Sequence, residues 1–323
     1  MRIILIGQEA FGRASLEALL DQGEQVVGVI TVPEVPGGKP NPVRELAEAR
    51  GIPCLQPRNL KGNRVYEWVR DLAPDLLVLA YVTEFVPGRI IQLARLGGIN
   101  YHPSLLPKFR GGTAINWAII YGEKETGVTI HYIDEGVDTG DIILQRRVEI
   151  GPDDTSASLY YNKLFPLGVE MIAEAVRLIR EGRAPRIRQD EALASFQPVI
   201  KESDTRIDWS QPVRRVHDLI RGAAPRPGAW TTRGGEKVKV WESALPAAVS
   251  AGAVPGGPGE MPGPAAPGAV PGQILEVSAA GVLVAAGEGV VLLKRLGAEA
   301  GPKLPAAEYA AQVGLAPGQR LGD

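Results

Sequence analysis

Asn100 and His102 lie two residues apart in segment 97–112, which is rich in Gly, Pro and polar residues. On an extended strand, side chains two residues apart project from the same face, about 6–7 Å from each other. A histidine accepts a proton near neutral pH, and an asparagine amide donates a hydrogen bond to an oxygen that becomes negative in a tetrahedral intermediate. Acyl transfer needs both roles. From two residues alone, a role in satisfying the loop's own backbone groups is equally consistent.

A carboxylate is the third group expected at this site. Asp138 follows the apolar segment 128–133 in a glycine-containing loop, and we predict that it reaches the same edge of the sheet. A buried carboxylate there would orient an imidazole and stabilise its positive charge. Spacing alone does not distinguish Asp138 from its acidic neighbours Asp134, Glu135 and Asp141.

The remaining histidines and the cysteine suggest no further chemistry. His131 lies inside an apolar run and is interpreted as a structural histidine, and His217 falls on an amphipathic helix. No spacing of ligand residues resembles a metal site, so no metal is expected. Cys54 is the single cysteine and is interpreted as a buried thiol, which fits a reducing compartment.

The elements that must position these residues alternate along the first part of the chain. Apolar runs and helical periodicity predict strands at 2–7, 26–32 and 75–81 and helices at 11–20, 42–50 and 65–72. This alternation predicts an α/β fold with a doubly wound parallel sheet. Open sheets of this kind place their sites outside the carboxyl ends of the strands, where segment 97–112 is expected.

The first turn of the chain argues against a dinucleotide cofactor. Residues 7–12 lack the middle glycine that lets a pyrophosphate approach, and Glu9 places negative charge where a phosphate would sit. Further along, two strands are expected within 126–144, followed by a long amphipathic helix at 156–182 that is interrupted near Pro166. We predict that the catalytic domain spans 1–185.

The rest of the chain is predicted to be a linker at 186–206 and a second domain at 207–323. Short β-like runs separated by turn residues are consistent with a small β-barrel. Residues 244–271 are dominated by Ala, Gly and Pro, and their composition predicts a flexible surface loop.

Composition and charge limit the classes of partner. The 323 residues exceed the roughly 100–200 of one domain, and 45% hydrophobic with 22% charged residues is a globular composition. A formal charge of −2 gives no general attraction to DNA or to anionic membranes. No apolar stretch reaches about 18 residues, so we expect a soluble cytoplasmic protein.

The motifs around the site resemble those of the folate-dependent formyltransferase family. Asn100-x-His102 is followed by Pro-Ser-Leu-Leu-Pro at 103–107, and Asp138 stands in a Val-Asp-Thr-Gly setting. The segments that look like the start of the family's small carboxyl-terminal domain are 207–209, 220–221 and 227–230. The resemblance implies a Rossmann-like formyltransferase domain, an OB-like second domain and 10-formyltetrahydrofolate as formyl donor.

The resemblance also implies a mechanism in which Asn100, His102 and Asp138 are catalytic. An acceptor amine attacks the formyl carbon, and Asn100 and His102 stabilise the tetrahedral oxyanion. Each good oxyanion donor contributes about 3 kcal/mol. His102 relays the proton toward the leaving N10 atom, and Asp138 holds the orientation of the imidazole.

Contacts with the donor and the acceptor are further implications of the resemblance. The pterin is expected between the loops at 83–86 and 133–138. The residues expected to bind it are Phe85, Val86, Ile133, Asp134 and Ser104, although Ser104 is equally consistent with a turn former. Lys108 and Arg110 are candidates for contact with an acceptor phosphate, with solvated surface charge as the alternative.

The default acceptor is methionyl-tRNA, although two observations weaken it. Where methionyl-tRNA formyltransferases carry a basic insertion, segment 31–42 holds one Lys and one Glu. From Asp204 onward, 12 Lys and Arg face 11 Asp and Glu, so the second domain nets about +1. The alternatives are an amino-sugar nucleotide, water, and a folate-binding protein without turnover.

Water is an alternative because residues 101–107 and 114–117 also look like the hydrolase domain of 10-formyltetrahydrofolate dehydrogenase. That relative typically has an apolar residue in place of Asn100. The presence of Asn100 therefore favours transfer to an amine.

Overall fold

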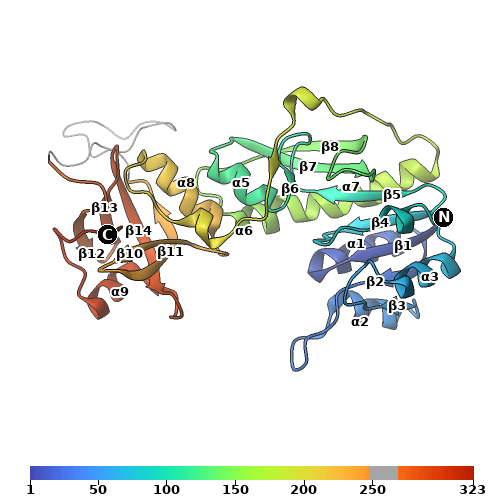
Figure 1. The fold of residues 1–323 in the computed structure, drawn as a ribbon, viewed down its shortest axis with the longest axis horizontal. Helices are drawn as coiled ribbons and strands as arrows, with labels where there is room; N and C mark the ends of the chain where they lie inside the picture. Colours follow the sequence, from blue (N-terminus) through green and yellow to red (C-terminus); the bar gives the residue numbers. More distant parts are fainter. Residues whose placement is uncertain (247–267) are drawn as a thin grey trace. The chain divides into compact units, whose positions relative to one another are not determined.

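The computed structural model describes residues 1–246 and 268–323 (Figure 1). The predicted loop at 244–271 lies mostly outside the described residues. The chain divides into two compact units, the first comprising 1–114, 125–149 and 160–198, and the second 115–124, 150–159 and 199–323. Both units are therefore discontinuous in sequence, and the domain limits given above remain predictions.

A seven-stranded sheet forms the first unit, in the order β3-β2-β1-β4-β5-β7-β8 (Figure 1). The strands are β1 (Arg2–Gly7), β2 (Gln25–Ile30), β3 (Cys54–Leu55), β4 (Leu76–Ala80), β5 (Gly98–His102), β7 (Glu125–Tyr132) and β8 (Ile142–Glu149). Strands β1 to β5 are mutually parallel, and β4 is buried along its whole length. A strand covered on both faces is expected to be continuously apolar, as β4 is. The predicted Rossmann-like parallel sheet is confirmed.

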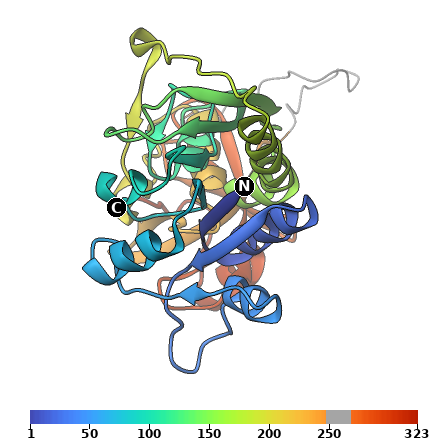
Figure 2. The same cartoon turned by 90° about the vertical axis from the view of Figure 1, so that its right-hand side faces the viewer.

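Two groups of helices cover this sheet. Helices α1 and α7 pack on each other, whereas α3 and α4 belong to an apolar cluster with β1 and β4 (Figure 2). The helices of the first unit are α1 (Glu9–Asp21), α2 (Pro42–Ala49), α3 (Asn63–Leu72), α4 (Gly88–Ile91) and α7 (Phe165–Arg180). Helix α6 (Ser156–Leu159) and all of α5 (Ala114–Ile120) except Ala114 belong to the second unit.

The helix predicted at 156–182 is interrupted slightly earlier than expected. A π-helical turn at Tyr160–Leu164 separates α6 from α7. Pro166 lies in the first turn of α7, where the missing N–H of a proline has no intrahelical partner to lose. The interruption therefore comes from the π-helical turn, with Pro166 just beyond it.

The last two strands of the sheet break the parallel pattern. Strand β7 pairs antiparallel with β5, and β8 pairs antiparallel with β7. The loop 133–141 between β7 and β8 is shorter than the dozen or more residues that a parallel crossover needs. A hairpin is therefore the pairing that this connection allows.

An antiparallel sheet and two helices form the core of the second unit. Its elements are α8 (Val213–Ala223), β10 (Ala229–Arg233), β11 (Glu236–Ala244), β12 (Ile274–Ser278), β13 (Gly281–Ala285), β14 (Val290–Ala298), β15 (Leu304–Pro305) and α9 (Ala306–Val313). The sheet runs β10-β11-β14-β13-β12, with β15 added to β14. Near the carboxyl terminus, Leu321 N donates to Gly272 O and Gly322 N donates to Thr232 O, which ties the sheet's two edges to one segment. An OB-like barrel remains a prediction.

Candidate active site

Strand β5 gives the sheet a polar face and an apolar face at the site. Asn100 and His102 share one face, as predicted, while Tyr101 is buried on the other. In register with them on β7, His131 pairs with Asn100 and Thr129 pairs with His102. Because directly opposed residues of paired strands share a face, four polar side chains line this side of the sheet.

The carboxylate of Asp138 lies at the centre of these groups. Its Oδ1 atom lies 3.3 Å from Asn100 Nδ2 and 3.4 Å from His131 Nε2. Its Oδ2 atom accepts a 2.9 Å hydrogen bond from Gly111 N and lies 3.5 Å from His102 Nδ1. The structure thus brings Asn100, His102 and Asp138 together and selects Asp138 among the acidic residues of its loop.

Asp138 reaches this position by a route that the sequence did not indicate. Because β7 is antiparallel to β5, loop 133–141 begins beside the amino end of β5, where Ile133 N donates to Gly98 O. We predicted that Asp138 reaches the same edge of the sheet as segment 97–112, but without a direction for strand β7. The loop returns to Asn100, with Asp138 at a left-handed φ of 55°.

Two residues fix the loop in this conformation. Gln189 Nε2 donates 2.8 Å hydrogen bonds to the carbonyl oxygens of both Asp138 and Gly140. A Cβ atom at Gly140 would lie only 1.8 Å from Tyr132 O, so no other residue fits there without movement. Sequence analysis did not identify Gln189, which lies about 50 residues after the loop that it holds.

Hydrogen bonding defines the tautomer of His102. Its Nε2 atom lies 2.8 Å from Phe109 O, and since a carbonyl oxygen only accepts, Nε2 carries a hydrogen. Burial lowers the pKa of His102, although the negative charge of Asp138 opposes this effect. The neutral imidazole therefore presents an unprotonated Nδ1 to the Asp138 carboxylate.

Asp138 is ionised in this setting. Burial by itself would raise the pKa of its carboxyl group, but His102, His131 and the N–H group of Gly111 outweigh burial and hold that pKa well below its ordinary value. A fixed negative charge 3.5 Å from Nδ1 stabilises the imidazolium that forms when His102 takes up a proton.

Asn100 uses both of its amide hydrogens within the site. Nδ2 lies 3.2 Å from His131 Nε2 and donates to Asp138 Oδ1 at 3.3 Å. Neither of these two hydrogen bonds is strong, because the one to Asp138 is longer than the usual 2.9–3.0 Å of an N–H···O bond and the one to His131 ends on a neutral nitrogen. A hydrogen bond to a substrate oxygen requires one of them to be given up.

His131 belongs to the site, which our interpretation as a structural histidine did not anticipate. Nδ1 donates to Tyr132 O at 2.8 Å, which leaves Nε2 facing Asn100 and Asp138. The alternation of Thr129 and His131 with apolar residues was a signal for a polar face. The pairing of His131 with Asn100 depends on strand register, which the alternation does not give.

The loop after β5 turns two predicted contact residues inward. Ser104 is fully buried, and its hydroxyl donates to Lys108 O, which is the turn-forming alternative. Arg110 is also buried and donates to Gln189 and Glu191. We therefore revise both residues to structural roles, and Lys108 stays an exposed candidate for acceptor contact.

The predicted pterin residues differ in exposure. Phe85 is 52% exposed, whereas Val86 is buried in the apolar cluster of α3 and α4. Ile133 packs against the same cluster. Asp134 accepts hydrogen bonds from Gly136 N and Thr139 Oγ1 within its own loop.

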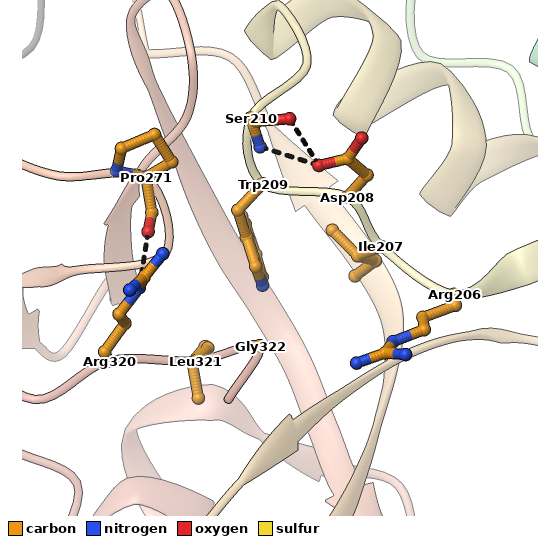
Figure 3. A pocket seen from close by; sticks show the side chains of 9 residues that line it. All are labelled: Arg206, Ile207, Asp208, Trp209, Ser210, Pro271, Arg320, Leu321 and Gly322. Carbon is orange, nitrogen blue, oxygen red and sulfur yellow. Dashed lines mark hydrogen bonds between the residues drawn. The ribbon is translucent and has the colours of Figure 1, made fainter.

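A separate cavity of about 400 Å³ lies within the second unit (Figure 3). Arg206 and Arg320 lie at its border, and Arg320 donates to Pro271 O. The carboxylate of Asp208 accepts hydrogen bonds from the backbone N–H and the hydroxyl of Ser210, so it already has hydrogen-bond partners within the protein. None of the predicted site residues lines this cavity.

Residues 1–246 and 268–323 contain neither a metal-binding cluster nor a membrane-spanning helix. No group of three or more His, Cys, Asp or Glu residues is arranged to hold a metal ion there. In the same part of the chain, no helix has the length and apolar character needed to cross a membrane.

The fold and the site define a doubly wound α/β enzyme with a second, antiparallel domain. The family model for formyl transferases matches residues 1–176, and the model for the formyl transferase carboxyl-terminal domain matches residues 199–314. The chain therefore belongs to the formyl transferase family, a family of group-transferring enzymes, as its motifs indicated.

Curated relatives cover the whole chain. It is 36% identical to a methionyl-tRNA formyltransferase of Desulforamulus reducens over 100% of its own length and 98% of the relative's length. It is 37% identical to that of Geobacter sulfurreducens, over 100% of this chain and 97% of the relative. A cytosolic 10-formyltetrahydrofolate dehydrogenase of Xenopus tropicalis is 41% identical over 96% of the chain, which spans 34% of that longer protein.

Solved structures support the fold. An N-formyltransferase from Helicobacter canadensis, solved with folinic acid and dTDP-3-aminofucose, has a TM-score of 0.67 at 19% identity and covers 90% of this chain and 98% of its own. HypX from Aquifex aeolicus, solved with tetrahydrofolic acid, has a TM-score of 0.64 at 20% identity. It covers 97% of this chain, which spans 47% of HypX.

Proposed function

We propose that this enzyme transfers the formyl group of 10-formyltetrahydrofolate to the amino group of methionyl-tRNA. The observation that carries the acceptor is the similarity to methionyl-tRNA formyltransferases over the full length of both chains. The observation that supports the chemistry is the convergence of Asn100, His102 and Asp138 on one face of the sheet.

His102 is the proposed proton carrier. The acceptor nitrogen forms a bond to the formyl carbon, the carbonyl electron pair moves to oxygen, and the attacking nitrogen loses a proton to Nδ1 of His102. The resulting imidazolium lies beside the ionised Asp138. When the tetrahedral intermediate collapses, the bond from carbon to N10 breaks and His102 returns the proton to N10.

Asn100 is the proposed oxyanion donor. Its amide nitrogen lies 3.2 Å from His131 Nε2 and 3.3 Å from Asp138 Oδ1. A developing negative oxygen is a stronger acceptor than a neutral imidazole nitrogen. We infer that the hydrogen bond to His131 is exchanged for one to the formyl oxygen as its charge grows.

We expect the donor to bind between the loops that follow β4 and β7. These loops carry the exposed apolar side chains of Phe85 and Val137, which are 52% and 47% exposed. Exposed apolar groups of this kind suit the faces of a pterin ring. Backbone groups of the two loops would supply the polar contacts, because Asp134 is already engaged within its own loop.

Hydrolysis is the second candidate reaction. The dehydrogenase relative from Xenopus tropicalis is 41% identical, which is higher than the identity to the methionyl-tRNA formyltransferases quoted above. Asn100 favours an amine as acceptor, because the hydrolase domain of that type of relative typically has an apolar residue there. An amino-sugar nucleotide is the third candidate, supported by the fold of the Helicobacter canadensis enzyme.

The test is a comparison of acceptors at one concentration of 10-formyltetrahydrofolate. Release of tetrahydrofolate is measured with methionyl-tRNA, with uncharged tRNA, with a dTDP-linked amino sugar and with buffer alone. We expect rapid release only with methionyl-tRNA. Equal release in all four reactions would establish a hydrolase, and release with the amino sugar alone would replace the proposed acceptor.

A further inference from the structure

A group of aromatic side chains lies where the order of the sheet changes direction. Strand β1 has β2 on one side and β4 on the other, and Gly7 at its end pairs with Ala80 at the end of β4. Open α/β sheets bind ligands outside the carboxyl ends of the strands at such a switch point. The residue that follows β4 there is Tyr81.

Tyr81 has an unusual backbone conformation that determines the direction of its ring. Its φ is 62°, in the left-handed region that non-glycine residues seldom occupy. Regular alternation would place it on the same face as Leu79, which packs in the cluster with α3 and α4. Its ring instead lies 6.5 Å from the ring of Phe11 and 5.7 Å from that of Tyr160, both measured between centroids.

The π-helical turn supplies the other aromatic residues. Tyr160 and Tyr161 begin this turn, and their ring centroids are 4.9 Å apart in an edge-to-face arrangement. Tyr161 is 65% exposed, and Tyr81 is 38% exposed. Single π-helical turns are rare and frequently lie at functional sites. This one joins the exposed ring of Tyr161 and the half-buried ring of Tyr160 to Tyr81.

The register of the sheet places these rings close to the reacting groups. Leu79 pairs in parallel with Asn100, so Tyr81 follows Leu79 as His102 follows Asn100. Adjacent strands are about 4.8 Å apart. The backbone of Tyr81 therefore lies roughly one strand spacing from the backbone of His102. The ring of Tyr81 is turned toward the face of the sheet opposite to that of Asn100.

The surroundings indicate what kind of group these rings receive. Glu9 is close enough to interact electrostatically with both Tyr81 and Tyr160, so the group that lies directly on these rings should be uncharged rather than a phosphate. The rings are open at the surface, which suits a flat group better than a small side chain that needs enclosure. Unpaired bases bind in this way, by stacking on exposed aromatic rings.

We propose that Tyr81 and Tyr161 form a stacking platform for an unpaired nucleobase of the acceptor, the base at the 3′ end of the aminoacylated RNA. The proposal rests on the proposed function. The donor would occupy the Asn100 face, and the acceptor would arrive from the opposite face over the ends of β1 and β4.

The test replaces Tyr161, whose exposed ring contributes little to folding. In Tyr161→Ala, the KM for methionyl-tRNA should rise about tenfold or more with kcat nearly unchanged, because stacking is lost from binding. Tyr161→Phe keeps the ring and should stay within about twofold of wild type. Tyr121→Ala, which removes another exposed tyrosine, serves as the control and should not change the KM.

A binding measurement separates this proposal from the proposed function. A short single-stranded RNA ending in adenosine is titrated against wild type and Tyr161→Ala, and the variant should bind at least about tenfold more weakly. Equal affinity, together with an unchanged KM, would overturn the platform even if methionyl-tRNA is formylated. A shift confined to the KM of a dTDP-linked amino sugar would assign the platform to a nucleotide-sugar base and contradict the RNA assignment.

Discussion

Among individual residues, Asp138 makes the largest number of connections in the site. It contacts Asn100, His102, His131 and the backbone of Gly111 within 3.5 Å. One negative charge therefore lies within reach of both histidines and the asparagine. This explains why the structure selects Asp138 over Asp134, which is engaged in its own loop, and over Asp141, which is more exposed.

Replacement of Asp138 by Asn should lower kcat by at least about two orders of magnitude. The variant keeps the shape of the side chain but loses the charge that stabilises a protonated His102. Asp141→Asn removes an equal charge from the same loop and is the matched control. Steady-state rates of formyl transfer test this, and a similar loss in both variants would contradict a specific role for Asp138.

The titration of His102 gives a prediction about protonation. Burial lowers its pKa and Asp138 opposes this, so its folded-state midpoint should lie below the ordinary value of about 6.5 and fall further in Asp138→Asn. At pH values between the folded midpoint and about 6.5, the unfolded chain binds this proton more readily than the folded protein does. The contribution of His102 to the free energy of unfolding is therefore present above about pH 6.5 and is lost as pH falls through the folded midpoint.

Nuclear magnetic resonance can follow this titration directly, since the chain contains only three histidines. A midpoint above about 6.5 in the wild type would show that burial does not dominate the pKa of His102. An upward shift in Asp138→Asn would show that the charge of Asp138 does not raise that pKa.

The residues of the site were predictable to different degrees. Asn100 and His102 were found from their spacing on a strand, since alternation determines which side chains share a face. Asp138 was selected by resemblance alone, because its approach depends on a returning loop. The contacts of His131 and Gln189 arise from strand register and from a segment distant in sequence, and neither leaves a local signal.

At the scale of elements, the loop 133–141 is the part on which the site depends most. It begins at the amino end of β5, and Gln189 and Gly140 hold it over the polar face. The parallel strands and most helices of the first unit were predictable from apolar runs and periodicity. The direction of β7 was not, because direction follows from the length of a connection and from tertiary pairing.

Gly140→Ala should destabilise the fold by about 3 kcal/mol and reduce formyl transfer strongly. A methyl group there would lie 1.8 Å from Tyr132 O, and the loop would have to move to relieve the overlap. Gly88→Ala is the control, since a Cβ atom at Gly88 meets nothing within 4 Å. Urea unfolding and initial rates test this, and equal behaviour of the two variants would contradict a tight fit of the loop.

For the whole molecule, the distribution of charge bears on the acceptor. The chain has a formal charge of −2, and the segment from Asp204 onward has 12 basic and 11 acidic residues. An RNA acceptor must then be bound by a small number of local contacts. The stacking platform at Tyr81 and Tyr161 is one contact of this kind that needs no net positive charge.

The affinity for methionyl-tRNA should decrease as salt concentration rises. Each phosphate contacted by Lys or Arg releases counterions, so the logarithm of affinity falls linearly with the logarithm of salt concentration. The slope, measured by equilibrium binding between 50 and 200 mM salt, counts the phosphate contacts. An affinity that does not change with salt concentration would mean that no phosphate of the RNA is contacted by Lys or Arg.

We propose that Asn100, His102 and Asp138 together deliver a formyl group to an amine. The most direct measurement is the ratio of formyl-methionyl-tRNA to tetrahydrofolate produced by the wild type and by Asn100→Leu, with free formate measured in parallel. We predict one formylated product per tetrahydrofolate in the wild type, and a rate at least about a hundredfold lower in the variant. Free formate as the main product of the wild type would contradict this account.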